Sequence, residues 1–401
     1  FWNQIRCNKI TKIHYLGGIL DILLKLPKKK SDRKHNVKLA FGAGAREETY
    51  SIFRKRFNLP LREVYGMTEA SSFSTIDFKN RIGSIGQTVP WFKINLSNIK
   101  KSKFFLDKGH CVAIPTETVY GLAANAYSDT AVKKIYKLKK RPKNNPSIVH
   151  YSNLKKLKND CELNKNFFIL YKKFCPGPIT FILKLKKNSK ISNYVTNNKN
   201  TVAIRFPKHK VARELLKKLN YPLAAPSANI STKISAVSPE DVKDEFGEKI
   251  KFVLNGGRSK IGLESTIINL VSKPEILRLG GIEINRLSKV LGLKLKFNNS
   301  VKKFTYPGQG KIHYSPHIPI RLNIKNPKKG EAFILIKKRK KIDKNFFYIT
   351  KNKNLKEAGK NLYKTLRNIK TKKYKSISVE KIPNKGLGLT INDRLKRASN
   401  K

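Results

Sequence analysis

Residues 111–139 read CVAIPTETVYGLAANAYSDTAVKKIYKLK. The opening run, CVAIP, is short, apolar and closed by a proline, which is typical of a buried strand. Residues 129–139 have the pattern of a helix. The same alternation continues downstream, with strand-like runs TVAIRF, PLAAP, KFVLN and STIINL and helix-like segments 154–158, 211–219 and 239–246. Strands interleaved with helices predict an α/β domain.

Blocks of different composition flank this domain. Residues 1–95 form a first block, and the α/β block spans 96–296. A connector rich in Lys and Asn, residues 297–319, leads to a third block, residues 320–401. The third block contains the strand-like runs AFILI, FFYIT and SISVEKI, a helix-like run over 354–367 and a final basic helix. We therefore expect a second, small α/β unit there.

The composition limits the class of protein. Of the 401 residues 39% are hydrophobic, which is enough for packed cores in two or three domains and too many for a mostly disordered chain. The apolar runs are too short to cross a membrane, so we expect a soluble protein without a membrane partner. The four cysteines include no C-x-x-C pair, which favours free thiols and a cytoplasmic location.

The charge balance has two interpretations. With 87 Lys+Arg against 26 Asp+Glu, the formal net charge is +61. A basic surface attracts nucleic acid, because it neutralises phosphates. The lysines, however, are spread along the whole chain beside abundant Asn, Ile and Phe, as a biased coding sequence would produce. We favour the bias, and RNA binding stays open as an alternative.

Short islands of Gly, Pro, hydroxyl and basic residues carry the functional signal. They are 115–121 (PTETVYG), 139–142 (KKRP), 145–150 (NPSIVH), 175–180 (CPGPIT), 202–205 (VAIR), 224–229 (AAPSAN), 262–266 (GLEST) and 276–281 (ILRLGG). In this order they resemble the threonylcarbamoyl-AMP synthase family, whose catalytic domain is YrdC-like. The resemblance covers about residues 97–401, because the connector 306–316 and the closing run 386–395 resemble the C-terminal domain of the family's longer variant.

The resemblance implies both a fold and a reaction. The fold is α/β, with a YrdC-like twisted open sheet around a concave pocket and a small Rossmann-like C-terminal domain. The reaction makes threonylcarbamoyl-AMP and pyrophosphate from L-threonine, bicarbonate and ATP with Mg²⁺, for threonylcarbamoyladenosine formation next to the tRNA anticodon. Downstream tRNA threonylcarbamoyl-transfer machinery, and tRNA itself, are candidate partners. Such chemistry needs positioning and charge neutralisation rather than a covalent nucleophile.

Site residues are implied by the same resemblance. The set around the phosphates is Lys139, Arg141, Ser227 and Asn229, and the ATP contacts are Arg141, Asn145, Thr201, Ser227, Ser235 and Arg278. The L-threonine contacts are Thr118, His150, Arg205, Ala225 and Ser265. Taken singly, Thr118 could close a turn, His150 could be a core histidine and Arg278 a surface ion-pair residue.

The expected metal and carboxylate contacts follow from residue chemistry. Arg205 suits the carboxylate of threonine, because its planar fork can donate two parallel hydrogen bonds. The islands hold no paired aspartates, so we expect phosphate oxygens and water to hold most of the Mg²⁺ coordination sphere. Glu117 and Glu264 are candidate protein ligands.

The first block resembles a different family. Residues 37–45 (VKLAFGAGA), 64–69 (VYGMTE) and 83–87 (GSIGQ) are similar to the middle of an adenylate-forming acyl-CoA synthetase. This resemblance implies that Thr68 lies near the α-phosphate of AMP and Glu69 near magnesium. The phosphate loop, the ribose-binding Asp and the lid lysine of that family are missing, so we predict no ligase activity. The only Met is Met67, so we expect a truncated or fused reading frame.

Two alternative functions remain. A YrdC-like module that binds double-stranded RNA or tRNA without catalysis would show salt-sensitive tRNA binding and no threonine-dependent turnover. An acid-CoA ligase active through residues 1–95 would form AMP in the presence of a carboxylic acid.

Overall fold

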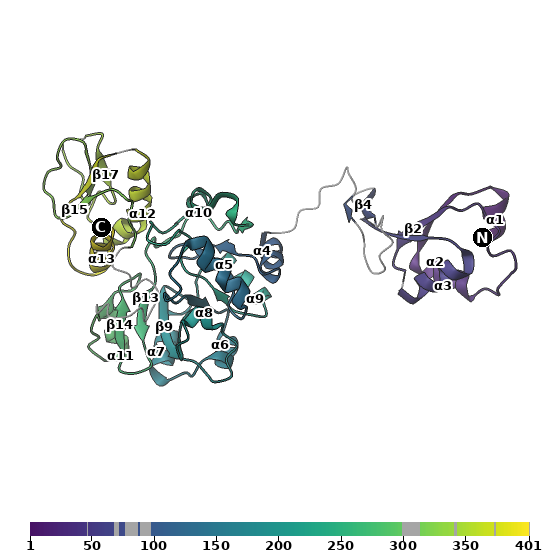
Figure 1. Ribbon diagram of the computed structural model, residues 1–401, viewed down its shortest axis with the longest axis horizontal. Helices are drawn as coiled ribbons and strands as arrows, with labels where there is room; N and C mark the ends of the chain where they lie inside the picture. The colour runs from purple at the N-terminus through teal and green to yellow at the C-terminus, as the bar shows by residue number, and fades with distance from the viewer. Residues whose placement is uncertain are drawn as a thin grey trace. The chain divides into compact units, whose positions relative to one another are not determined.

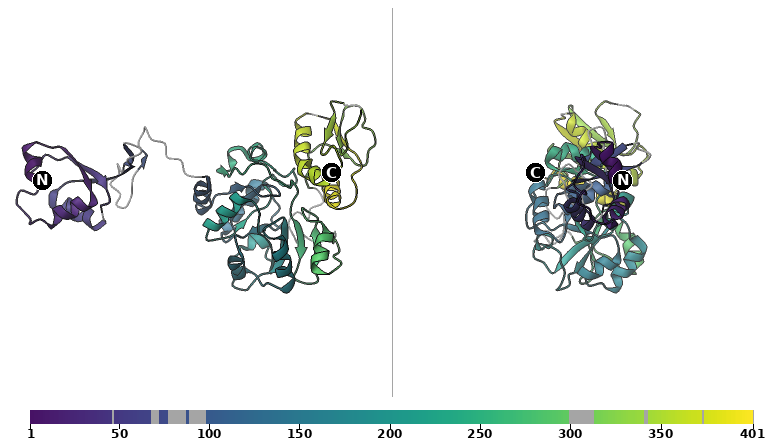
Figure 2. Two further views of the ribbon diagram at one scale, coloured as in Figure 1. Left: turned by 180° about the vertical axis from the view of Figure 1, so that it is seen from behind. Right: turned by 90° about the vertical axis from the view of Figure 1, so that its right-hand side faces the viewer.

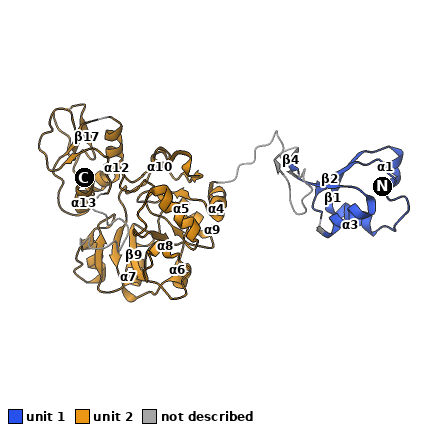
Figure 3. Cartoon of the chain, viewed as in Figure 1, with its two compact units in different colours: residues 1–96 blue, residues 97–401 orange. Residues whose placement is uncertain are grey.

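The computed structural model describes residues 1–45, 47–67, 72–76, 87–88, 98–298, 313–340, 343–372 and 374–400. The chain divides into two compact units, residues 1–96 and 97–401 (Figure 3). Within the described ranges, no helix is long and apolar enough to cross a membrane.

The first unit contains one five-stranded sheet. Its strands pair in the order β1-β2-β3-β4-β5; β1 to β3 are parallel and β4 and β5 antiparallel. Aromatic side chains such as Tyr15, Phe53 and Phe57 are buried in its core. Thr68, Glu69 and most of the 83–87 motif lie outside the described residues. The elements are α1 (Trp2–Cys7), β1 (Lys12–Leu16), α2 (Gly17–Lys25), β2 (Leu39–Ala43), α3 (Glu47–Phe57), β3 (Leu61–Met67), β4 (Ser72–Ile76) and β5 (Gln87–Thr88).

The second unit begins with a nine-stranded mixed sheet, which confirms the expected α/β class (Figure 1). The strand order is β12-β6-β7-β11-β8-β10-β9-β13-β14. The strands are β6 (Val112–Ile114), β7 (Gly121–Asn125), β8 (Ile148–His150), β9 (Ile179–Lys184), β10 (Thr201–Arg205), β11 (Leu223–Ala224), β12 (Phe252–Val253), β13 (Thr266–Asn269) and β14 (Glu275–Arg278).

The predicted helices α5, α6, α9 and α10 begin and end close to their predicted positions, whereas α4, α7, α8 and α11 were not predicted. The helices expected over 129–139 and 239–246 have those bounds, and α10 carries a capping box in which Ser238 and Asp241 exchange hydrogen bonds. The helices are α4 (Asn98–Asp107), α5 (Asp129–Lys139), α6 (Leu154–Asp160), α7 (Lys165–Phe174), α8 (Asn193–Thr196), α9 (Lys210–Lys218), α10 (Pro239–Phe246) and α11 (Ile284–Leu291), with a 3₁₀ turn over Gly247–Lys249.

The central strands present different residues on their two faces. Val149, Ile204 and Phe181 belong to the main hydrophobic core, which also includes side chains from the surrounding helices. Successive side chains of a strand point to opposite faces, so the neighbouring His150 and Arg205 face the other side. That second face lines a pocket to which both His150 and Arg205 contribute.

The C-terminal part is a smaller α/β layer. Its four strands are all parallel, in the order β15-β18-β16-β17, as a Rossmann-like arrangement requires. Its core is continuous with apolar side chains of the catalytic part, including Val119, Ile234 and Leu263. Figure 2 shows the two parts lying side by side. The elements are β15 (Ile320–Arg321), β16 (Glu331–Leu335), β17 (Phe346–Tyr348), α12 (Leu355–Thr371), β18 (Ser376–Val379) and α13 (Leu387–Ser399).

Candidate active site

One pocket brings together eight of the thirteen predicted site residues. It contains about 510 Å³ of space outside atoms, including open solvent at its mouth. The predicted residues in its wall are Thr118, Arg141, His150, Arg205, Ala225, Ser227, Ser265 and Arg278. Other wall residues include Thr116, Tyr120, Glu264, His313 and Tyr314.

The ends of strands position these side chains. Parallel strands β8 and β10 place His150 and Arg205 opposite one another in register. Arg278 ends β14, and Ser265 directly precedes β13. The strands therefore fix the backbone positions of these four residues around the pocket.

Arg205 is held by the turn that follows β6. Its Nη2 donates to Glu117 Oε1 at 2.7 Å, and its Nη1 donates to Thr118 Oγ1 at 2.8 Å. Glu117 Oε2 also accepts the backbone N–H of Lys208 at 2.9 Å. Both Arg205 and Glu117 are buried, so the guanidinium keeps one orientation toward the pocket.

Thr116 closes the turn between β6 and β7. Its Oγ1 accepts the backbone N–H groups of Thr118 and Val119, and it lies 2.8 Å from Thr118 Oγ1. The turn-closing role considered for Thr118 thus belongs to Thr116. Thr118 instead turns its hydroxyl to Arg205.

His150 is a buried, neutral side chain in the wall. Burial, and then the positive charge of Arg205, lower the pKa of His150 to about 3. Its Nδ1 has no hydrogen-bond partner among the described residues. A core histidine with satisfied hydrogen bonds is therefore not what the structure contains.

Arg141 enters the pocket just beyond α5. The helix ends at Lys139, and the C-cap residue Lys140 has a left-handed backbone with φ of 49°. Arg141 Nη2 donates to Asn145 Oδ1 at 2.6 Å and to the carbonyl of Pro146 at 2.7 Å. Asn145 thus lies behind Arg141 rather than in the wall, and it fixes the guanidinium.

Lys139 lies beneath the wall rather than in it. Its Nζ donates to the carbonyl of Ser227 at 2.6 Å and to the carbonyl of Asn229. Burial, and then the nearby Arg141, lower the pKa of Lys139 well below its usual value. Asn229 Nδ2 donates to the carbonyls of Ile230 and Lys233 at 2.8 Å. These bonds shape the loop that presents Ser227.

Arg278 is a buried residue of the wall. Its Nε donates to the carbonyl of Ser265 at 3.1 Å, and its Nη2 donates to Ser265 Oγ at 3.1 Å. Ser265 Oγ in turn lies 2.7 Å from Thr180 Oγ1. This burial rules out a surface ion-pair role for Arg278.

Besides Asn145, two more predicted ATP contacts lie outside the wall. Thr201 begins β10, at the opposite end of the strand from Arg205, and lines a separate hollow with Pro146 and Thr196. Ser235 Oγ donates to Glu264 Oε1 at 2.7 Å, so it meets the pocket only through that carboxylate.

The two carboxylates expected to contact magnesium are both paired with arginine. In the described part of the chain, no group of three or more His, Cys, Asp or Glu side chains is arranged to hold a metal ion. Glu117 is paired with Arg205, and Glu264 with Arg394 at 2.8 Å. Burial raises the pKa of Glu264, but Arg394 and Arg278 outweigh it and bring this pKa to about 2. Both candidate carboxylates are thus already neutralised by arginine.

Sequence reasoning missed four residues at or behind the wall. His313 and Tyr314 line the pocket, while Tyr363 and Arg394 contact Glu264 from behind. The motifs 306–316 and 386–395 contain His313, Tyr314 and Arg394, but no spacing rule links them to Glu264. Only tertiary packing places Arg394 beside a carboxylate 130 positions earlier.

Three family models match the chain. The Sua5/YciO/YrdC model, described as telomere recombination, matches residues 105–280. The C-terminal domain of threonylcarbamoyl-AMP synthase matches residues 282–400, and the AMP-binding enzyme model matches residues 1–105.

Curated relatives decide the family. Threonylcarbamoyl-AMP synthase of Pyrococcus abyssi is 35% identical over 317 residues, which cover 74% of this chain and 92% of the relative. The enzyme of Bacillus subtilis is 33% identical over 325 residues, covering 76% and 94%. The chain belongs to the threonylcarbamoyl-AMP synthase family. This confirms the resemblance inferred from the islands.

A solved structure agrees with the membership in the threonylcarbamoyl-AMP synthase family. The crystal structure of P. abyssi Sua5 complexed with L-threonine matches with a TM-score of 0.70 at 32% identity. The match covers 76% of this chain and 96% of the other. The expected YrdC-like catalytic domain with its C-terminal α/β domain is thereby confirmed.

Proposed function

We propose that this chain makes threonylcarbamoyl-AMP and pyrophosphate from L-threonine, bicarbonate and ATP. The observation that carries the proposal is the convergence of Arg141, Arg205 and Arg278 on one buried pocket. Buried arginines hold their charge without losing side-chain freedom on binding, so they suit a polyanion and a carboxylate. Family membership gives the reaction for which this charge is used.

Threonine fits the part of the pocket around Arg205. Three of the five N–H groups of this guanidinium donate to Thr118, Glu117 and Gly177, which leaves two for a ligand carboxylate. The neutral His150 offers an acceptor nitrogen beside it. Ala225 leaves room for a side chain, and Ser265 supplies a hydroxyl.

ATP fits the part around Arg141, Ser227 and Arg278. Lys139 supports the Ser227 loop through its carbonyls, so we assign it a positioning role there. Asn145 orients Arg141 in the same way. Mg²⁺ would accompany ATP, held mainly by phosphate oxygens. Thr201 and Ser235 would act only through neighbouring groups.

The bonds of the reaction balance without a protein nucleophile. The threonine amine adds to bicarbonate and water leaves, which gives a carbamate. A carbamate oxygen then bonds to the α-phosphorus of ATP, the bond from that phosphorus to the bridging oxygen breaks, and pyrophosphate leaves. The arginines stabilise the charge that accumulates on the phosphoryl oxygens.

The product defines the partners. A mixed carbamic–phosphoric anhydride hydrolyses readily, so we propose transfer to the tRNA threonylcarbamoyl-transfer machinery, in the cytoplasm, with tRNA as the final acceptor. Binding of tRNA by this chain itself remains a prediction of the alternative RNA-binding function.

Pyrophosphate release tests the proposal. The full chain, given ATP, Mg²⁺ and bicarbonate, should release pyrophosphate only when L-threonine is added. Salt-sensitive tRNA binding without threonine-dependent release would support the RNA-binding alternative instead. Acid-dependent AMP formation would support the ligase alternative from residues 1–95.

A further inference from the structure

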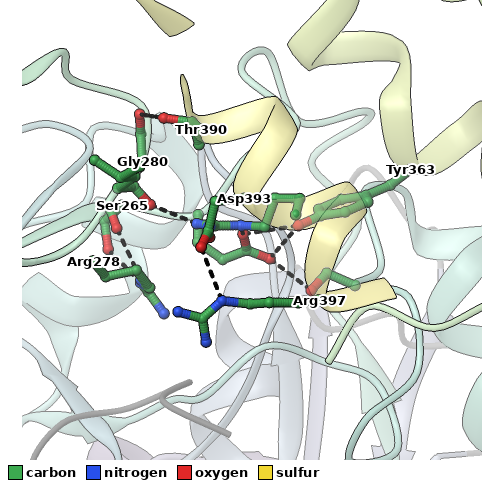
Figure 4. Close-up of polar contacts among 11 residues, drawn as sticks. Ser265, Arg278, Gly280, Tyr363, Thr390, Asp393 and Arg397 are labelled. Carbon is green, nitrogen blue, oxygen red and sulfur yellow. Dashed lines mark hydrogen bonds and ion pairs between the residues drawn. The ribbon is translucent and has the colours of Figure 1, made fainter. Parts of the chain in front are cut away.

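Helix α13 of the C-terminal part reaches the backbone beside Arg278. Thr390 Oγ1 donates to the carbonyl of Gly280 at 3.1 Å, and Arg394 Nη2 donates to the carbonyl of Leu279 at 2.6 Å. Leu279 and Gly280 directly follow Arg278 in the chain. Figure 4 shows Thr390 of α13 beside Gly280, near Ser265 and Arg278.

Arg394 also holds the acidic residue of the pocket wall. Its Nε donates to Glu264 Oε2 at 2.8 Å. Tyr363 Oη lies 3.0 and 2.9 Å from the two oxygens of the same carboxylate, and Ser235 Oγ donates to Oε1. All four residues are buried. Glu264 therefore accepts hydrogen bonds from Tyr363 and Arg394 of the C-terminal part and from Ser235 of the catalytic part.

Arg394 Nη1 also donates to Asp393, and Arg397 pairs with that same carboxylate at 3.0 Å. A further contact of Arg394 is with the connector. The guanidinium carbon lies 4.9 Å from the ring centroid of Tyr314, which is cation–π range. The Tyr314 ring stacks on Tyr363, with centroids 5.6 Å apart. Tyr314 itself lines the pocket. One side chain thus supports three separate wall segments that are distant in sequence.

The charge of Glu264 gives this contact a functional consequence. Among the described residues of the wall, Glu264 is the one carboxylate, and it faces a space in which we place a triphosphate. In a buried site a charge is poorly screened, so an unpaired Glu264 would repel the phosphates. Arg394, at 1% exposed, supplies the compensating charge without entering the pocket.

We propose that Arg394 is a positioning residue through which the C-terminal part prepares the pocket for ATP. It neutralises Glu264 and holds the Leu279 backbone and the Tyr314 ring in place. This inference rests on the proposed synthase activity. It predicts a defect that is specific for ATP, because threonine is a zwitterion and responds less to one unpaired charge.

The experiment measures threonine-dependent pyrophosphate release by the full chain, with ATP and threonine varied separately. The variants are Arg394→Met, Glu264→Gln and their combination. Arg394→Met should raise the KM for ATP by about tenfold or more, and the KM for threonine by about twofold or less. Adding Glu264→Gln should bring the KM for ATP back toward the wild-type value, because the unpaired charge is gone.

Two further variants complete the design. Arg339→Met removes another arginine of the C-terminal part. The Arg339 side chain does not line the pocket, and it pairs with Glu380 at an N···O distance of 3.4 Å. This variant should leave both KM values unchanged. Tyr363→Phe keeps the ring and removes only the hydroxyl, so it serves if Arg394→Met fails to fold. It should raise the KM for ATP by about threefold, since one hydrogen bond to a charged group is lost.

The contrary results are equally specific. A folded Arg394→Met variant with wild-type KM for ATP would overturn the inference, as would an unchanged KM in Tyr363→Phe. Equal increases for both substrates that Glu264→Gln fails to reverse would mean a purely structural role, and would overturn it too. An inactive wild-type chain would overturn the proposed function itself, which the other results leave intact.

Discussion

Arg205 and Glu117 form a buried ion pair of 2.7 Å at the edge of the pocket. The pair fixes one side of the guanidinium and leaves the rest to face a ligand. Removing only the arginine would leave a carboxylate buried without its cation. Stability and threonine binding therefore both depend on Arg205, but for separable reasons.

Arg205→Ala should lower the free energy of unfolding by roughly 3 kcal/mol, because breaking a buried pair strands the other charge. Urea denaturation measures this change. The double variant Arg205→Ala with Glu117→Gln should recover much of the stability and none of the threonine affinity. Recovery of both would show that Arg205 has only a structural role.

Lys139→Met should reduce kcat/KM about a hundredfold or more, because the Ser227 loop loses the donor that holds its carbonyls. Steady-state pyrophosphate release measures the loss. The matched control is Lys140→Met, which alters an exposed neighbour and should leave kcat/KM at the wild-type value. Equal effects in the two variants would contradict the assigned role.

The stability of the fold should depend on pH through His150. Its folded pKa of about 3 lies below the ordinary unfolded value of about 6.5. The unfolded state therefore binds the proton more readily between these values. The stability that comes from keeping His150 neutral is complete above the unfolded pKa and is lost as pH falls toward the folded one.

His150→Gln should weaken this acid sensitivity. Between about pH 7 and pH 5 the wild type should lose up to about 2 kcal/mol through His150, and the variant should lose correspondingly less. Denaturation curves at the two pH values give the comparison. Identical acid sensitivity in both proteins would mean that His150 is not held neutral in the folded state.

Gly280 permits the close approach of two wall segments. A Cβ at this position would lie 2.3 Å from backbone atoms of Ser265 and Thr266, which cannot move aside cheaply. Gly280→Ala should therefore destabilise the fold by about 1–3 kcal/mol and raise the KM for ATP. Gly18→Ala in α2, where a Cβ meets nothing within 4 Å, is the control: it should not destabilise the fold, because Ala favours helix over Gly, and it should leave the kinetics at the wild-type values.

The sequence predicted much of the fold, because strands and helices in residues 97–401 have clear patterns and caps. Strands β7, β8, β9 and β14 were not among the predicted runs. In β7 the reason is composition, since GLAAN consists mostly of small residues with low strand propensity. The same small residues allow the closely packed centre of the sheet. Local pattern therefore failed where tertiary packing determined the strand.

The candidate site was predictable where a motif carries its own chemistry. Arg141, Arg205 and Ser227 were implied by the resemblance of their motifs to the family, and all three line one pocket. The pairing of Glu264 with Arg394 was not predictable, because it joins two domains across 130 positions. Nor did the overall net charge of +61 indicate the site, since the three arginines of the pocket contribute only a small part of that charge.

The most direct measurement is the identification of the product. Full-length chain incubated with ATP, Mg²⁺, bicarbonate and L-threonine should yield threonylcarbamoyl-AMP by mass spectrometry, with one pyrophosphate for each molecule formed. Omitting threonine or bicarbonate should abolish both signals. Absence of the adenylate in the complete mixture, from a chain shown to be folded, would contradict the proposed synthase activity.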